Sequence, residues 1–462
     1  MTTPPRRGRT RTAGRALPLL ALLLAAPLAV AAGGCATVQT PAPAAVPMSP
    51  RNVVLLIADG FGPASATLGR AAKGAPLALD SVLVGAVETS ATDGRVTDSA
   101  ASATAYACGT KTYRGAIGVT PNGAPCRTVL EAAEARGMAT GLVATGRVTD
   151  ATPAAFAAHV ASRADEAEIA RQMAGSGVDL LFGGGARFFA GPADAASTDA
   201  VPLTETMTAD GWGVALDRAG YDALRALPAA ALLAPNNLAY EIDRDGTDQP
   251  SLAEMTEKAL DLLSAEAGER GFFLMVEGNR IDDAAHRNDP AAHLGDILAY
   301  DRVVAAALAW AARDGHTLVV STADHEAGGL TLGRDDTNVW DPAPLLRATA
   351  SFEAMAARIG AGGDAADVIR EALGVDALPE GAAETFRGSV EARDPSALLP
   401  LLEALASEPA GVGWTTKGHT AVDVGLYAWG PGADRFRGAM ANDAVGRALF
   451  AVLGLETARA GR

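Results

Sequence analysis

The stretch Val53-Val-Leu-Leu-Ile-Ala-Asp59 decides the fold class, because it is an unbroken apolar run that ends at an acid. An apolar run without alternation is typical of a strand buried on both faces, as in a parallel sheet. Four similar runs are separated by alanine-rich amphipathic segments: Ala139–Ala144, Val178–Phe182, Phe272–Val276 and Thr317–Thr322. The sequence therefore predicts an α/β fold, with a central, mostly parallel sheet flanked by helices on both faces.

Three of these runs lead directly into acids or a histidine. Asp59 follows the first run, Glu277 follows Phe272–Val276, and the pair Asp324-His325 follows the last. In open α/β sheets ligands bind at the carboxyl ends of strands, so we expect these groups to converge on one edge. Carboxylates gathered in this way repel one another unless cations lie among them. Metal ions are therefore expected at this edge.

The histidines divide into two groups. The chain has six, and three lie in motifs flanked by acids or glycine: His286, His325 and His419. His286 follows Asp282 by four residues, so both would face one cation if this segment is helical. The other three, His159, His293 and His316, are expected to be structural: His159 on a helix after Pro153, His293 at a helix start and His316 before a strand.

The segment Arg95-Val-Thr-Asp-Ser-Ala-Ala-Ser-Ala-Thr-Ala105 places Ser99 at the start of a predicted helix, with Thr97 and Asp98 as capping residues. A hydroxyl there meets unpaired backbone N–H groups, which favour an oxyanion and a bound phosphate. An ordinary helix cap explains this segment equally well, so its neighbours in the fold must decide between the two interpretations.

Seven segments together resemble the alkaline phosphatase family of metal-dependent phosphomonoesterases. Besides the Ser99 segment they are Leu56-Ile-Ala-Asp-Gly-Phe-Gly62, Thr110-Lys-Thr-Tyr-Arg-Gly-Ala-Ile-Gly118, Asp150-Ala-Thr-Pro-Ala-Ala155 running on to His159 and Arg163, Val276-Glu-Gly-Asn-Arg-Ile-Asp-Asp-Ala-Ala-His286, Thr322-Ala-Asp-His325 and Thr416-Lys-Gly-His-Thr420. They follow the family's order from about residue 52 to the C-terminus.

The resemblance implies a complete set of metal ligands. One zinc ion would take Asp282, His286 and His419. The second zinc ion would take Asp59, Asp324, His325 and the alkoxide of Ser99. Magnesium would take Asp59, Thr152 and Glu277. The donor types agree with this division, because mixed imidazole and carboxylate ligands suit zinc whereas an all-oxygen set suits magnesium.

The implied reaction is hydrolysis of small phosphate monoesters to an alcohol and inorganic phosphate through a phosphoserine at Ser99. Arg163, expected on the helix that follows Asp150, has a guanidinium that matches two oxygens of a terminal phosphate; a surface arginine is the alternative interpretation. By resemblance, Asp98 pairs with Arg163. Asp283 stands where enterobacterial relatives carry lysine and animal relatives histidine, so phosphate contacts must differ there, and Asp283 with Asp150 favours a hydrated magnesium between them.

Rival functions fit the residues less well. Phosphodiesterases on this scaffold commonly use a threonine nucleophile and lack the arginine clamp, and sulfatases need a Cys/Ser-x-Pro-x-Arg context that is absent around Ser99. A phosphate-binding lipoprotein without catalysis is expected to lack a ligand or the nucleophile, and none is missing. The chain has 38 Lys and Arg against 54 Asp and Glu, a net charge of −16 that argues against nucleic acid as a partner.

The N-terminus predicts export to the periplasm or cell envelope. Residues 1–34 hold five arginines and no acid, with an apolar run from Ala16 to Ala32, and read as a signal peptide. Cys35 is the candidate for lipid attachment, which would be the only link to a membrane; a plain signal peptide cut nearby is the alternative. Residues 35–50 are an expected flexible tether, and 51–462 the catalytic domain, with a cap-like helical insertion at about 334–412.

Two further questions stay open at the level of sequence. Cys108 and Cys126 could form a disulfide in an oxidising compartment, or Cys108 could be a small buried thiol after the alanine-rich helix. The family is frequently homodimeric, and the apolar content permits an interface, but no segment identifies one.

Overall fold

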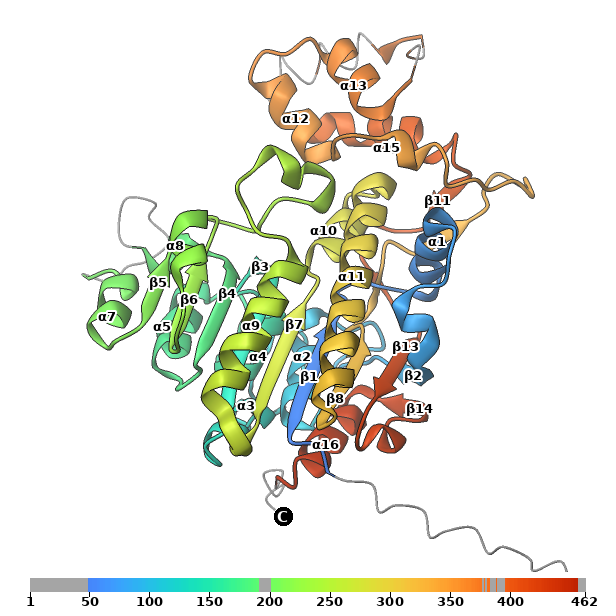
Figure 1. Ribbon diagram of the computed structural model, residues 1–462. Helices are drawn as coiled ribbons and strands as arrows, with labels where there is room; N and C mark the ends of the chain where they lie inside the picture. The colour runs from blue at the N-terminus through green and yellow to red at the C-terminus, as the bar shows by residue number, and fades with distance from the viewer. Residues whose placement is uncertain are drawn as a thin grey trace, which may run out of the picture. The chain divides into compact units, whose positions relative to one another are not determined.

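One mixed sheet of ten strands organises the described residues (Figure 1). Its order is β14-β2-β13-β8-β1-β7-β3-β4-β6-β5, and β13 alone runs antiparallel to its neighbours. The strands are β1 Asn52–Ile57, β2 Leu83–Glu88, β3 Ala139–Arg147, β4 Leu180–Gly184, β5 Gly213–Ala215, β6 Ala229–Leu232, β7 Phe272–Glu277, β8 Thr317–Thr322, β13 Val424–Trp429 and β14 Gly438–Ala441. The predicted α/β class and mostly parallel sheet are confirmed.

This computed structural model describes residues 49–190, 201–375 and 395–455, with positions 378, 380–382 and 388. The predicted signal peptide, Cys35 and the tether up to residue 48 lie outside the described residues. Among the residues that are described, no helix combines the length and apolar character needed to cross a membrane.

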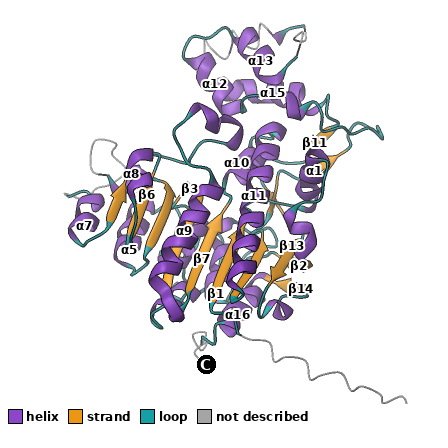
Figure 2. Cartoon of the chain, in the orientation of Figure 1, coloured by secondary structure: helices purple, strands orange, loops and turns teal. Residues whose placement is uncertain are grey.

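Helices cover both faces of the sheet (Figure 2). Those of the main body are α1 Pro63–Lys73, α2 Ser99–Cys108, α3 Val129–Glu134, α4 Ala151–Ala157, α5 Glu166–Gly175, α6 Ala186–Phe189, α7 Leu203–Ala209, α8 Arg218–Ala223, α9 Leu252–Ala267, α10 Arg280–His286, α11 Pro290–Asp314 and α16 Asn442–Val452. Helices α9 and α11 pack on one face, while α2, α3 and α4 pack together on the other. Short 3₁₀ turns are η1 Ala78–Val82, η2 Glu241–Gly246, η3 Gly268–Arg270 and η6 Ala433–Arg435.

The centre of the sheet explains why charged groups meet at one edge. Strand β1 is fully buried and lies between β7 and β8, both parallel to it. In this register Ile57 is opposite Glu277 on one side and Thr322 on the other. The residues that follow these strands therefore leave the sheet at the same edge.

A second group of helices has an apolar core of its own. It consists of α12 Phe352–Gly360, α13 Ala365–Leu373 and α15 Leu399–Ser407, with η4 Leu345–Arg347 and η5 Pro395–Leu398. Asp289, at the start of α11, accepts a hydrogen bond from the backbone N–H of Phe352 and so ties α12 to the main body. These helices fall within the predicted insertion at 334–412, whose role as a cap stays a prediction. Two small ribbons flank it: β10 Leu330–Leu332 with β11 Val412–Trp414, and β9 Glu326–Ala327 with β12 His419–Thr420.

Cys108 and Cys126 form a disulfide with a Cα–Cα distance of 5.9 Å, which resolves the alternative that the sequence leaves open. Cys108 is the last residue of α2, and Ser99 is the first. The disulfide therefore fixes the far end of the helix that carries the candidate nucleophile.

Candidate functional site

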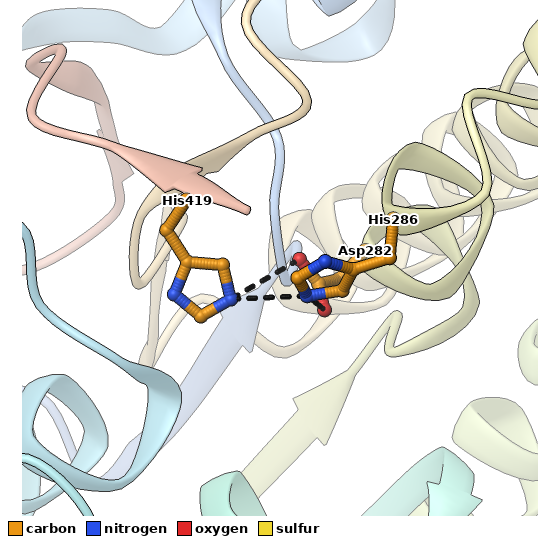
Figure 3. Close-up of side chains that lie close together, drawn as sticks. All are labelled: Asp282, His286 and His419. Atoms are coloured by element: carbon orange, nitrogen blue, oxygen red, sulfur yellow. Dashed lines mark hydrogen bonds and ion pairs between the residues drawn. The ribbon is translucent and has the colours of Figure 1, made fainter. Parts of the chain in front are cut away.

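The first cluster of metal-binding side chains joins helix α10 to ribbon strand β12 (Figure 3). Asp282 and His286 lie one turn apart on α10, as their spacing predicts, with His286 Nε2 3.0 Å from Asp282 Oδ2. His419 Nε2 lies 3.1 Å from His286 Nε2 and 3.9 Å from Asp282 Oδ1. Two ligands about 2.0–2.1 Å from a tetrahedral zinc ion lie roughly 3.3 Å apart, so these distances fit one shared ion.

The hydrogen bonds of the two imidazoles leave both Nε2 atoms available to a shared cation. His286 Nδ1 lies 2.5 Å from the carbonyl oxygen of Lys417, and His419 Nδ1 lies 3.0 Å from that of Thr97. Because a carbonyl only accepts, we assign the proton of each neutral ring to Nδ1, and each Nε2 then presents a lone pair to the other. When no metal ion is bound, a proton on Nε2 takes the place of the cation, because the hydrogen bond to Asp282 raises the pKa of His286 to about 9.

The second cluster lies at the ends of β1 and β8. His325 Nε2 is 3.2 Å from Asp324 Oδ2 and 3.5 Å from Asp59 Oδ1. The hydroxyl oxygen of Ser99 lies 3.1 Å from the same nitrogen. Asp59, Asp324 and His325 are almost wholly buried. Burial, together with the charge of Asp324, raises the pKa of Asp59 well above its ordinary value, which is the cost of placing acids together without a cation.

Glu277 and Thr152 lie beside Asp59. Both carboxylate oxygens of Glu277 and the hydroxyl of Thr152 are buried without a hydrogen-bond partner, and so is Asp59 Oδ1. Burial and the charges of Asp150 and Asp324 raise the pKa of Glu277 to about 8. Buried polar atoms without partners are costly, and an all-oxygen set of this kind suits magnesium.

Ser99 begins helix α2, as predicted. Asp98 is the N-cap residue, and its Oδ1 accepts the backbone N–H of Ala101 at 3.0 Å. Its other oxygen accepts the N–H of Gly115 at 2.9 Å. Ser99 is 3% exposed and its hydroxyl contacts His325 of the second cluster, so the helix cap is observed and the role of Ser99 in the site stays a prediction.

Arg163 reaches this site from a loop and not from a helix. Helix α4 ends at Ala157, and the following segment is extended because Val160 pairs with Ile117 through backbone hydrogen bonds. The expectation that Arg163 and His159 continue the helix is therefore wrong. Arg163 Nη2 donates to Asp150 Oδ1 at 2.8 Å, and Nη1 lies 3.5 Å from Asp98 Oδ2.

Asp150 and Asp98 stabilise the positive charge of Arg163. Burial lowers the pKa of its guanidinium, but Asp150 and Asp98 raise it by more, so the net shift is upward. The guanidinium therefore remains charged at alkaline pH. The family resemblance named Asp98 as its partner, whereas Asp150 makes the shorter contact in the structure.

Asp283 has partners that the sequence did not reveal. Its Oδ2 accepts hydrogen bonds from Asn237 Nδ2 and Arg280 Nη1, both at 2.7 Å. Arg147 donates to Asp150 at 2.9 Å. Arg147 and Arg280 each precede their aspartate by three residues, whereas Asn237 is 46 residues from Asp283 and carried no sequence signal. His293, expected at a helix start, lies in the first turn of α11 and is buried between Ser65 and the carbonyl of Ile281.

Comparison with known proteins decides the family. The family model described as Alkaline phosphatase matches residues 50–455. The alkaline phosphatase of Schizosaccharomyces pombe is 38% identical over 430 residues, which cover 86% of this chain and 80% of the relative. The chain belongs to the alkaline phosphatase family. Like other alkaline phosphatases it is a phosphomonoesterase, with metal-binding clusters of histidine and aspartate.

Solved alkaline phosphatases share the fold. The cold-active alkaline phosphatase from a psychrophilic Shewanella superposes with a TM-score of 0.80 at 34% identity, covering 87% of this chain and 99% of that one. A variant of the alkaline phosphatase from the Antarctic bacterium TAB5, with Mg bound in its M3 site, gives a TM-score of 0.66 at 27% identity, covering 88% and 99%.

Proposed function

We propose that this phosphatase hydrolyses small phosphate monoesters with Ser99 as nucleophile and Arg163 as the phosphate-binding residue. The observation that carries the assignment is the position of the Ser99 hydroxyl. It stands at the first turn of α2 and 3.1 Å from His325 of the second cluster. A helix N-terminus stabilises negative charge on a hydroxyl oxygen and on a bound phosphate.

The residues present fit two zinc ions and one magnesium ion. Asp282, His286 and His419 would hold the first zinc, and Asp59, Asp324 and His325 the second, with Ser99 completing it. Asp59, Thr152 and Glu277, whose buried oxygens lack hydrogen-bond partners, would hold magnesium. When bound, these ions supply the positive charge that stabilises a serine alkoxide and the alkoxide that leaves.

The chain's own residues bind and orient the ester. The guanidinium of Arg163 offers two parallel N–H groups to two non-bridging oxygens of a terminal phosphate. A monoester has a third non-bridging oxygen for the other groups of the site, whereas a diester has only two. Asp150 and Asp98 fix that guanidinium from behind. Attack by Ser99 gives a phosphoserine with release of the alcohol, and water then releases inorganic phosphate from the serine. The backbone carbonyls of Lys417 and Thr97 hold His286 and His419 in the tautomer that leaves Nε2 free.

The test is chemical trapping of the intermediate. Incubation with a ³²P-labelled monoester at acidic pH, followed by an acid quench, should label the wild-type enzyme at one serine, and Ser99→Ala should take up no label. Ser102→Ala is the matched control, because Ser102 lies on the same helix, is buried and accepts a hydrogen bond from the side chain of Asn442. Labelling of the Ser99→Ala enzyme at a stoichiometric serine would show that the nucleophile is another residue.

Metal content is a second, independent readout. Elemental analysis of the purified enzyme should give about two zinc ions and one magnesium ion per chain. Chelation should abolish turnover, and zinc with magnesium should restore it. Restoration by magnesium alone would contradict the assignment of the two histidine clusters to zinc.

We also infer export of the enzyme to the periplasm or cell envelope. The arginine-rich, apolar N-terminus supports this proposal, and so does the Cys108–Cys126 disulfide, since disulfides persist in oxidising compartments. Lipid attachment at Cys35 predicts that the mature protein partitions into detergent, whereas Cys35→Ser does not. A wild-type protein found wholly in the aqueous phase, with its N-terminus elsewhere, would exclude the anchor.

A further inference from the structure

Arg147, the last residue of β3, donates to other side chains from all three nitrogens of its guanidinium. Its Nε donates to Glu166 Oε2 at 2.8 Å, its Nη1 to Asn237 Oδ1 at 3.0 Å and its Nη2 to Asp150 Oδ2 at 2.9 Å. Its side chain is 21% exposed. Three acceptors in three directions fix a planar fork more tightly than any single ion pair. Each of the three nitrogens of Arg147 is therefore tied to an acceptor within the protein.

One of those acceptors is shared with Arg163. Asp150 gives Oδ2 to Arg147 and Oδ1 to Arg163, and Oδ1 also accepts the backbone N–H of Ala151. Each oxygen is thus held from its own side, so the plane of this carboxylate is fixed. Burial raises the pKa of Asp150, but the charges of Arg163 and Arg147 lower it by more, and the group stays ionised.

The second arm of Arg147 leads to helix α10. Asn237 Oδ1 accepts both the side chain and the backbone N–H of Arg147, the latter at 3.1 Å. The amide nitrogen of Asn237 then donates to Asp283 at 2.7 Å. Asp283 is the neighbour of Asp282, so this chain of hydrogen bonds joins the phosphate-binding residue to the helix that carries the first cluster.

We propose that Arg147 is a positioning residue for the known reaction. It sets the guanidinium of Arg163 relative to α10 by holding Asp150 with one arm and, through Asn237, Asp283 with another. Without Arg147, Asp150 loses one of its two cations and is free to turn toward Arg163, drawing that guanidinium away from the phosphate. The preference for monoesters over diesters should fall as a result. The inference rests on the proposed role of Arg163.

The experiment compares a monoester with a diester in four variants: Arg147→Gln, Arg147→Lys, Arg163→Ala and the double variant Arg147→Gln/Arg163→Ala. Arg147→Gln should lower kcat/KM for the monoester about 10- to 100-fold while changing that for the diester severalfold at most, because misplacement of a binding group by about 1 Å has costs of this order. Inhibition by inorganic phosphate should weaken in parallel. Arg147→Lys, which keeps the charge but not the fork, should lie between Gln and wild type.

The double variant separates positioning from general damage. If Arg147 acts through Arg163, then adding Arg147→Gln to the Arg163→Ala enzyme should lower kcat/KM for the monoester by less than about twofold. Arg218→Gln is the matched control, since Arg218 also bonds two acids but lies on α8 and should leave all kinetic constants unchanged. Should Arg147→Gln fail to fold, Asn237→Ala tests the same connection, with a smaller loss in the same direction.

The outcomes distinguish the inference from the proposal beneath it. Suppose that Arg163→Ala lowers the ratio of monoester to diester kcat/KM and that neither Arg147→Gln nor Asn237→Ala does. The positioning role of Arg147 is then overturned, and the phosphate-binding role of Arg163 stands. Additive losses in the double variant, or equal losses on both substrates, overturn it as well. If Arg163→Ala affects both substrates equally, the assignment of Arg163 fails, and the inference fails with it.

Discussion

Removal of the Cys108–Cys126 disulfide should lower the free energy of unfolding by an amount that depends on the length of the loop it closes. The bond closes a loop with a sequence separation of 18. Loop-closure entropy for such a length corresponds to about 3 kcal/mol at 25 °C. Unfolding entropy of about 2 cal/mol/K per residue gives roughly 0.8 kcal/mol/K for roughly 400 residues, so the melting temperature should fall by about 4 °C.

The assay is differential scanning calorimetry of wild type and the double variant Cys108→Ser/Cys126→Ser at equal zinc and magnesium concentrations, since bound metal also shifts the melting temperature. Turnover at 25 °C should change little, because Asp98 still caps the other end of α2. The two single serine variants are controls for the effect of a polar group at either position. A melting temperature unchanged within about 1 °C would refute the entropic argument.

Three further predictions concern other charged groups. Burial raises the pKa of Glu134 to about 7, so the folded state binds its proton more tightly and stability falls as pH rises from about 4 to 7; Glu134→Gln should raise the melting temperature more at pH 9 than at pH 5. Asp289→Ala should lower the free energy of unfolding, measured by urea denaturation, by on the order of 3 kcal/mol, because the backbone N–H groups of Phe352, Ala291 and Ala292 lose their acceptor. Asp283→Lys should tighten inhibition by inorganic phosphate in steady-state assays, as added positive charge attracts the anion.

The sheet could be predicted because its central strands carry a local signal. Each predicted run, such as Val53–Ala58 or Thr317–Thr322, overlaps an observed strand. Strands at the margins were not predicted: β2 has a half-exposed pattern, and β13 is antiparallel with glycine and tyrosine in its sequence. A strand buried on both faces has a continuous apolar sequence, whereas a strand buried on one face has a weaker pattern.

The site divides in the same way. The ligands at strand ends and on one turn of α10 were expected, because sheet topology and helix spacing alone bring them together. The loop that carries Arg163 was not, since its extended course depends on pairing with Ile117, far along the chain. Arg147 and Asn237 lie 90 residues apart, and no local pattern connects them.

Hydrogen bonding sorts the carboxylates of this site into two kinds that the sequence could not tell apart. Asp150 and Asp283 bond arginines, whose positive charges already balance these carboxylates. Asp59, Glu277 and Asp324 are buried, and each has at least one oxygen without a hydrogen-bond partner. An unpaired buried acid either takes up a proton or requires a cation, and the raised pKa of Glu277, about 8, reflects that choice. The strand-end acids are thus the candidates for binding metal, while the arginine-paired acids hold neighbouring side chains in place.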